Sequence, residues 1–237
     1  MPNNFLIFCY PRTGSYHLTS LLDSANDITC HGEIFKTQKV ELRKWFAKRV
    51  SAKSVAERDL DPKLFVDELR ATTPKKHFGF KVFQGHVVHT PYLQSLLDDP
   101  TWKVISLWRE PIEVHASLQR ALQTKIWIVK NGSEKNKENL NELITFSPER
   151  YDTFLKSYSN FYNLCKLYAD RDNGFMINYN QLSDTEVIDQ LLDFIGSDAA
   201  ADELASEYKK QFSLPVYQGF TNPDEAQEYV LSRPFKS

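Results

Sequence analysis

The sequence of 237 residues contains few cysteines, carries little net charge and has no long apolar run. Its three cysteines (Cys9, Cys30 and Cys165) are widely spaced and form no CxxC pair, so a disulfide framework or a cysteine metal site is not expected. We interpret them as buried free thiols in a reducing compartment. Because 29 Lys and Arg residues against 31 Asp and Glu residues leave a formal charge of -2, no general basic field attracts nucleic acid or an anionic membrane. Any anion must therefore be bound at a local site.

The N-terminal segment also lacks the features of a targeting sequence. It begins without a cationic stretch, and its apolar run (residues 5–10) is too short for a signal-peptide core or a membrane span. Together with the expected free thiols, this predicts a cytoplasmic protein with no membrane span.

Short apolar runs alternate with stretches of helical periodicity. Strands are predicted at residues 5–10, 78–83, 103–108 and 176–179, and helices at 16–24, 111–123 and 148–168. The aromatic stripe of the segment 148–168 is typical of a helix packed against a core. This alternation predicts an α/β fold with a P-loop-like central parallel sheet flanked by helices on both faces, in one domain over residues 1–237. The polar segment 130–141 is interpreted as a solvated loop that interrupts the fold, with a mobile lid as a second interpretation.

The turn after the first predicted strand is the most informative segment. It reads Pro11-Arg12-Thr13-Gly14-Ser15 and leads directly into a predicted helix. A glycine-containing turn at a helix N-terminus directs several backbone N–H groups at one point, where the helix dipole favours phosphate. Arg12 would add a bidentate donor, and Thr13 and Ser15 would add hydroxyl groups. The alternative interpretation is an ordinary turn with a surface arginine. Neither the Walker A pattern GxxxxGK[ST] nor the dinucleotide pattern GxGxxG is present.

The strand–PRTGS–helix segment resembles the 5′-phosphosulfate loop of sulfotransferases that use 3′-phosphoadenosine 5′-phosphosulfate (PAPS), and most of all the bacterial carbohydrate sulfotransferases of the nodulation-factor and trehalose types. A second segment, KVISLWREPIEVHASLQRAL (residues 103–122), places Arg109 after a predicted strand and Ser117 two turns into the next predicted helix. In this family such a pair binds the 3′-phosphate. The resemblance covers roughly residues 5–195. It implies a PAPS-dependent sulfotransferase that transfers a sulfuryl group to a hydroxyl of a carbohydrate or glycolipid, with 3′-phosphoadenosine 5′-phosphate (PAP) as product and no metal.

The resemblance also assigns roles to single residues. Arg12 and the residues that follow it hold the 5′-phosphosulfate, Arg109 and Ser117 hold the 3′-phosphate, and Tyr179 of the segment GFMINYNQLSD lies near the adenine. The loop residues concerned are Thr13, Gly14, Ser15, Tyr16 and His17. After Tyr179 the usual acidic pattern is replaced by Asn180 and Gln181. The C-terminal glycine-rich loop RKGxxGDWK of the cytosolic relatives is missing, and Arg233 and Lys236 are the basic residues available there.

Sulfuryl transfer to a hydroxyl needs a base, for which the sequence offers two candidates. Glu33 follows the segment 29–32, interpreted as a turn, where the bacterial carbohydrate branch has its catalytic glutamate; alternatively, it pairs with a nearby arginine. His86, in a predicted loop ahead of Arg109, lies roughly where the cytosolic branch places a catalytic histidine. His86 and His89 form an HxxH pair without a third ligand, so a metal site is not expected. Lys81 either stabilises the leaving phosphate or points to solvent.

Two other functions stay open. A nucleotide or small-molecule kinase on a P-loop scaffold would need a loop lysine and an acidic magnesium ligand, and neither is evident. A non-catalytic nucleotide-binding protein of sulfotransferase descent would keep both phosphate motifs without turning over an acceptor. The acceptor itself is not predicted, because segments 36–60 and 124–147 carry no recognisable motif.

Overall fold

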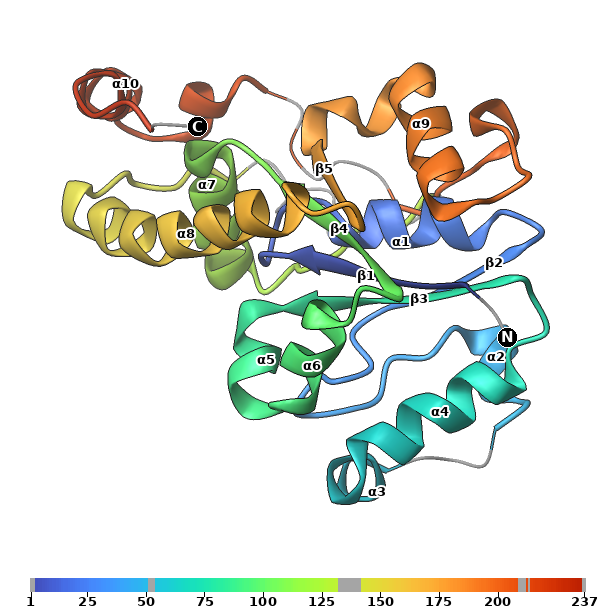
Figure 1. Cartoon of the computed structure of the whole chain (residues 1–237). Coiled ribbons are helices and arrows are strands. Elements are labelled where there is room, and N and C mark those ends of the chain that lie inside the picture. The colour runs from blue at the N-terminus through green and yellow to red at the C-terminus, as the bar shows by residue number, and fades with distance from the viewer. Residues whose placement is uncertain (1–2, 51–53, 132–141, 209–211, 213, 236–237) are drawn as a thin grey trace.

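Five parallel strands form the centre of the computed structural model, which describes residues 3–50, 54–131, 142–208, 212 and 214–235. The strands are β1 (Asn3–Cys9), β2 (Ile28–His31), β3 (His77–Phe83), β4 (Trp102–Trp108) and β5 (Gly174–Asn178). They lie in the order β2-β3-β1-β4-β5, and each neighbouring pair is parallel (Figure 1). The predicted α/β class and parallel sheet are confirmed.

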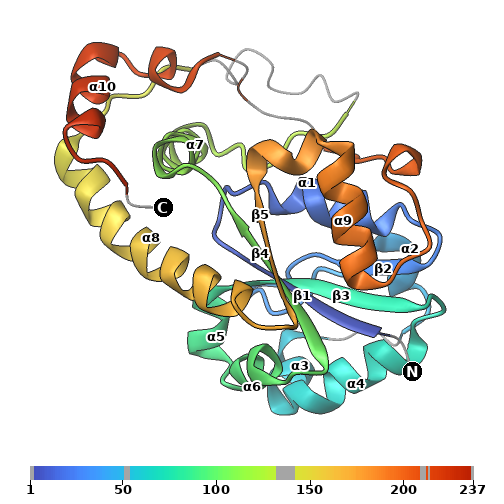
Figure 2. The ribbon, with the colours of Figure 1, turned by 45° about the horizontal axis from the view of Figure 1, so that its top comes forward.

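Helices cover both faces of the sheet, as predicted. On one face lie α1 (Ser15–Asp23) and α9 (Thr185–Ile195), and on the other lie α4 (Pro62–Thr72), α6 (Tyr92–Asp98) and α8 (Pro148–Ala169) (Figures 1 and 2). The remaining helices are α2 (Lys44–Ala47), α3 (Val55–Leu60), α5 (Gln84–His89), α7 (Pro111–Thr124) and α10 (Pro223–Leu231), with 3-10 turns η2 (Tyr179–Ser183), η3 (Ala201–Glu203) and η4 (Val216–Gly219).

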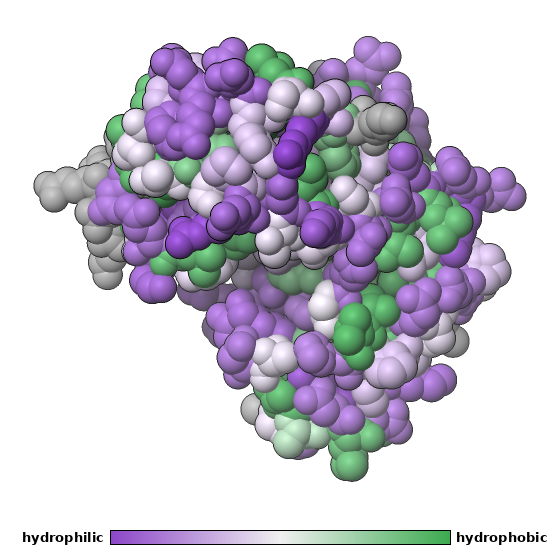
Figure 3. Space-filling model, turned by 90° about the vertical axis from the view of Figure 1, so that its left-hand side faces the viewer, coloured by the Kyte–Doolittle hydropathy of each residue, from purple (hydrophilic) through white to green (hydrophobic). Residues whose placement is uncertain are grey.

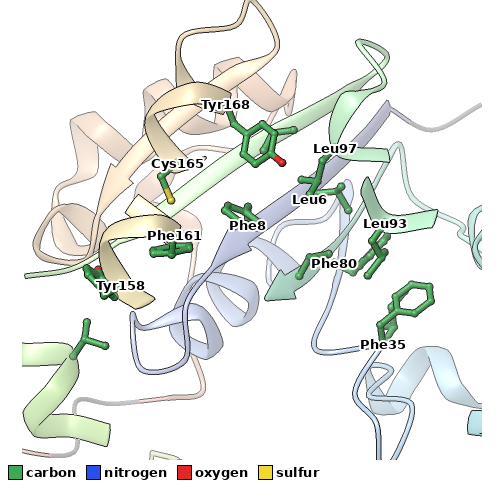
Figure 4. Packing of buried hydrophobic residues seen from close by; sticks show 14 of the residues in the cluster. Leu6, Phe8, Phe35, Phe80, Leu93, Leu97, Tyr158, Phe161, Cys165 and Tyr168 are labelled. Atoms are coloured by element: carbon green, nitrogen blue, oxygen red, sulfur yellow. The ribbon is translucent and has the colours of Figure 1, made fainter. Parts of the chain in front are cut away.

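The core consists of two apolar layers separated by the sheet. Because successive side chains of a strand point to opposite faces, Leu6 and Phe8 of β1 enter one layer while Phe5 and Ile7 enter the other. The aromatic stripe of α8 packs on the first layer, as predicted. Figure 4 shows Phe161 and Tyr168 of α8 beside Phe8, with ring centroids 5.4 and 5.2 Å from that of Phe8. Cys9, Cys30 and Cys165 are buried and free, as expected.

The segment 29–32, predicted as a turn, is mostly strand. Its residues 28–31 are completely buried and pair with β3 at the edge of the sheet. The run is too short to show the alternation or length by which strands are recognised. Its position matters, because it directs the chain toward Glu33 at the end of the sheet.

His86 also lies in a different element from the predicted one. It belongs to the short helix α5, which follows β3 directly, rather than to a loop. Helices α2 to α6 were expected only as helical stretches between the strands and were not placed individually. Of these, α2, α3, α5 and α6 have four to seven residues, too few to establish a helical period. Of the predicted polar loop 130–141, residues 132–141 lie outside the described residues.

The strands are parallel, so their carboxyl ends meet at one edge of the sheet. At this edge β1 leads into α1, β3 into α5, β4 into α7 and β5 into η2. Ligands of open parallel sheets bind at this edge. Among the described residues, no helix combines the length and the apolar character needed to cross a membrane.

Candidate active site

The turn from β1 to α1 has a backbone that requires glycine. Gly14 caps α1 with a φ of 89°, in the left-handed region where glycine is favoured. A Cβ atom at this position would lie 2.3 Å from Cδ2 of Tyr179. The ring of Tyr179 therefore packs directly on the turn, and the absence of a side chain at Gly14 makes room for it.

Three backbone N–H groups of this turn remain for a ligand. The Thr13 N–H donates to the Tyr10 carbonyl, and the N–H groups of His17 and Leu18 donate to the Gly14 carbonyl. The Thr13 hydroxyl is buried and also donates to the Tyr10 carbonyl, at 2.8 Å, so it stabilises the turn from inside. The N–H groups without an acceptor in the described part of the chain are those of Gly14, Ser15 and Tyr16.

Gly14, Ser15 and Tyr16 line a cavity of about 580 Å³ at the carboxyl edge of the sheet. Figure 3 shows that the face of the molecule at this edge is hollowed. The cavity contains most of the predicted site residues and several apolar side chains that were not predicted. It is lined by Pro11, Arg12, Gly14, Ser15, Tyr16, His17, Glu33, Lys36, Gln38, Phe83, Arg109, Glu113, Ala116, Ser117, Arg120, Trp127, Ile128, Val129, Tyr179, Tyr208, Phe212, Leu214 and Val216.

Arg109 and Ser117 both form hydrogen bonds with Arg12. The Nε atom of Arg12 donates to Ser117 Oγ at 3.0 Å, and Nη1 of Arg109 donates to the Arg12 carbonyl at 3.3 Å. Arg109, just before α7, also pairs with Glu113 in the first turn of that helix, at 2.7 Å. Burial, together with the nearby charges of Arg109 and Arg120, lowers the pKa of Arg12 to about 10. The cavity therefore concentrates positive charge beside the turn.

Tyr179 lies in the same part of the cavity. It is the first residue of η2, directly after β5, and not the end of a strand as predicted. The guanidinium carbon of Arg109 lies 4.0 Å from the centroid of its ring, a cation–π contact. Tyr179 thus links the turn at Gly14 to Arg109.

Arg120 was not predicted as a site residue, although it lines the cavity and is only 7% exposed. The signal was available in the sequence. Glu113, Ser117 and Arg120 are spaced by four and three residues along α7, which places them on one helix face. Applying this periodicity beyond Ser117 would have identified Arg120.

Glu33 lies at another part of the cavity wall within a buried polar network. One oxygen, Oε1, lies 3.1 Å from Lys81 Nζ and accepts from the Tyr16 hydroxyl at 3.1 Å. Lys81 is completely buried, so the interpretation that it points to solvent is wrong. Its burial lowers the pKa of Lys81, while the Glu33 carboxylate opposes that shift. The cationic neighbours of Glu33 are Lys81 and, at 4.0 Å, Lys36.

Lys81 lies between Glu33 and the turn that joins β1 to α1. Its Nζ donates to Ser15 Oγ at 3.4 Å and lies 3.2 Å from the centroid of the Tyr16 ring. The Tyr16 hydroxyl is shared between Glu33 and Glu41, which it contacts at 2.8 Å. Burial and the two carboxylates raise the pKa of Tyr16, so this hydroxyl is a neutral donor near neutral pH.

His86 lies behind Glu33 and does not line the cavity. Its Nδ1 accepts from the Phe83 N–H at 3.2 Å, and its Nε2 lies 3.7 Å from Glu33 Oε2. Burial lowers the pKa of His86 to about 4, although the Glu33 charge acts in the opposite direction. Within the described residues, no group of three or more His, Cys, Asp or Glu side chains is arranged to hold a metal ion.

Of the two C-terminal basic residues, Arg233 does not line the cavity and pairs with Asp152 at 2.7 Å. Lys236 lies outside the described residues. At the cavity, His17 instead contacts the C-terminal part of the chain, with Nδ1 3.2 Å from the Tyr208 carbonyl oxygen.

Known proteins resemble this chain in sequence and in fold. No model of a known protein family matches the chain. The chain is 23% identical over 237 residues to nodulation protein H of Rhizobium tropici, covering 99% of this chain and 92% of that protein. The solved sulfotransferase of Alicyclobacillus acidocaldarius has a TM-score of 0.52 and 14% identity, covering 99% of this chain and 97% of that one. Mouse sulfotransferase SULT7A1, solved with PAP, has a TM-score of 0.48 and 11% identity, covering 99% of this chain and 68% of that one. The resemblance inferred from the two motifs is confirmed, and the chain has the fold of the Alicyclobacillus sulfotransferase.

Proposed function

We propose that this chain transfers a sulfuryl group from PAPS to a hydroxyl of a carbohydrate or glycolipid. The proposal rests on one observation: residues of both phosphate motifs line the same cavity, and so does the carboxylate of Glu33. Arg12 of the first motif bonds to Ser117 of the second, and Glu33 lines the same cavity. Group transfer from a bound nucleotide needs both features, an anion site and a base within reach of the acceptor.

The nucleotide is assigned to the two motifs. The N–H groups of Gly14, Ser15 and Tyr16, together with the Arg12 side chain, would hold the 5′-phosphosulfate, which supplies the sulfuryl group when it is bound. Arg109 and Ser117 would hold the 3′-phosphate, and Tyr179 would pack against the adenine. In the described structure the Thr13 hydroxyl is committed to the Tyr10 carbonyl, so Thr13 acts by shaping the turn.

Glu33 is the proposed base. It lines the cavity, whereas His86 does not. Glu33 would accept the proton of the acceptor hydroxyl as that oxygen bonds to sulfur and the bond from sulfur to the phosphate oxygen breaks, leaving its electron pair on the phosphate. Lys81 is the cation nearest to Glu33, with its Nζ 3.1 Å from Glu33 Oε1. His86 is neutral, lies behind Glu33 and is assigned no part in the transfer.

The acceptor class is supported by the polar side chains near Glu33. Lys36 and Gln38 line the cavity just beyond Glu33 in the chain, and His17 lines it from α1. Such hydrogen-bonding groups suit an acceptor with several hydroxyls, as carbohydrates have.

The kinase alternative is disfavoured by the surroundings of the loop hydroxyls. A magnesium ion beside a loop hydroxyl needs oxygen ligands. Here Ser15 Oγ faces the Lys81 ammonium group, and the Thr13 hydroxyl is buried on a backbone carbonyl. Transfer of the sulfuryl group to any acceptor would exclude the non-catalytic alternative.

The testing experiment is a transfer assay with PAPS labelled in its sulfate. We expect label to move to at least one member of a panel of mono-, di- and oligosaccharides and glycolipids, with most of the rate kept in a chelator. Binding of PAP without transfer to any member would favour the non-catalytic alternative. A rate that collapses in chelator and recovers with magnesium would contradict the proposal.

A further inference from the structure

We infer that Arg120 is a ligand-binding residue that, with Arg109 and Ser117, holds the 3′-phosphate of the nucleotide. This inference rests on the proposed function, because it names a further residue of the same nucleotide site.

The first observation is that Arg120 is a buried cation without a carboxylate partner. It is 7% exposed, and no Asp or Glu side chain among the described residues forms an ion pair with it. Burial lowers the pKa of its guanidinium group to about 10, which leaves it charged at neutral pH. A buried charge is costly unless it is paired. An anion in the cavity would provide the missing partner.

The second observation is the way the guanidinium group is held. Nε donates to the Glu142 carbonyl at 3.1 Å and Nη2 to the Gly219 carbonyl at 3.4 Å, while Cζ lies 3.7 Å from the Phe212 ring centroid. These contacts fix the orientation of the group but do not use Nη1. Within the described residues Nη1 has no acceptor, and Arg120 lines the cavity. The side chain is therefore positioned in advance for a ligand.

The third observation is the charge balance of this part of the cavity. Three guanidinium groups, Arg12, Arg109 and Arg120, are near enough that the other two both depress the pKa of Arg12. Glu113 is the carboxylate paired with Arg109. Because Arg12 is assigned to the 5′-phosphosulfate and Arg109 is paired with Glu113, Arg120 supplies positive charge that no carboxylate among the described residues pairs with. Arg120 lies one helical turn beyond Ser117, on the same face of α7, so it belongs with the pair assigned to the 3′-phosphate.

The competing explanation is a purely structural role, in which Arg120 joins the segments around Glu142 and Gly219. The two roles differ in one measurable property. A structural defect weakens every nucleotide, whereas loss of a 3′-phosphate ligand weakens only nucleotides that carry this phosphate.

The test is calorimetry of Arg120→Met with PAP and with adenosine 5′-phosphosulfate, which lacks the 3′-phosphate. We expect the Kd for PAP to rise at least tenfold and the Kd for adenosine 5′-phosphosulfate to change less than threefold. The ratio of the two values within one variant does not depend on the fraction of folded protein. Arg120→Lys, which keeps the charge, should recover part of the ratio and serves if the methionine variant does not fold.

Arg171→Met is the matched control. Arg171 also donates to a backbone carbonyl, that of Leu97, and it does not line the cavity, so its ratio should equal that of the wild type. Equal weakening of both nucleotides by the Arg120 variants, or no weakening, would overturn the inference. Failure of the wild-type protein to bind PAP would instead overturn the proposed function.

Discussion

Arg12 Nε donates to Ser117 Oγ at 3.0 Å, a contact between residues separated by 105 positions in the sequence. It joins the turn after β1 to the first half of α7. Arg109 adds a second link by donating to the Arg12 carbonyl. Two segments that each resemble half of a nucleotide site are therefore one structural unit, so substitutions in either should act on the same ligand.

The first prediction concerns Arg109→Ala. The variant should bind PAP more weakly by on the order of 2–4 kcal/mol, because a charge-assisted contact in a mostly buried site is lost. Binding of adenosine 5′-phosphosulfate should change far less. Titration calorimetry with both nucleotides measures this difference, and equal weakening of the two would remove Arg109 from the 3′-phosphate site.

Gly14→Ala should distort the turn that joins β1 to α1. A methyl group here would strain the left-handed backbone and lie 2.3 Å from the Tyr179 ring, displacing the ring that stacks on Arg109. We expect at least a tenfold loss of PAP affinity in calorimetry. Gly85→Ala is the matched control, since a Cβ there meets no atom within 4 Å, and it should bind PAP as the wild type does. Unchanged PAP binding by Gly14→Ala would contradict the assigned role of the turn.

Glu33→Gln should lower turnover by roughly a hundredfold or more, the range typical of losing a positioned general base, while PAP affinity changes little. The substitution keeps the size of the side chain and removes its basicity. In parallel kinetic assays His86→Asn should retain most of the turnover, because His86 does not line the cavity. The opposite pattern, with a normal Glu33 variant and an inactive His86 variant, would move the base to His86.

Much of the fold was predictable because long elements have strong periodicity. The buried strand β1 and the aromatic helix α8 were recognised from their apolar patterns, and α7 from the proline at its start. Short elements such as β2 and α5 were not, because four to six residues do not establish a period, and tertiary packing decides their structure.

The site was predictable where its residues lie in a local motif, as Arg12, Gly14 and Arg109 do. The Lys81–Glu33 pair was not, because the contact joins β3 to the segment after β2, and strand order cannot be read from either segment alone. The same holds for the apolar wall around Phe212 and Leu214, which comes from a distant part of the chain.

A fourth prediction concerns stability in acid. Burial lowers the pKa of His115 from 6.5 to about 4, and Nδ1 of this residue has no hydrogen-bond partner among the described residues. Between these two pH values the unfolded chain binds a proton that the folded chain does not. The contribution of neutral His115 to the free energy of unfolding is therefore complete above about pH 6.5 and is lost as the pH falls toward 4. The slope from one such histidine is up to about 1.4 kcal/mol per pH unit.

In His115→Phe the free energy of unfolding should therefore fall less steeply between pH 6.5 and 4.5 than it does in the wild type. The ring of His115 packs against Tyr151 and Phe154, with centroids 5.3 Å away in both cases, so an aromatic replacement suits the site. Urea unfolding at several pH values measures the slope in each protein. Because the comparison is of slopes, a constant packing change does not affect it. An identical slope in the variant would show that His115 is not neutral in the folded protein.

Calorimetry of the wild-type protein with PAP in the presence of a chelator, beside a titration with ATP and magnesium, tests whether the cavity is a PAP site. We assign the 3′-phosphate to Arg109, Ser117 and Arg120, and the 5′-group to the turn at Gly14. We therefore expect tight PAP binding without metal and much weaker binding of ATP with magnesium. Tight, magnesium-dependent binding of ATP with no binding of PAP would contradict this assignment.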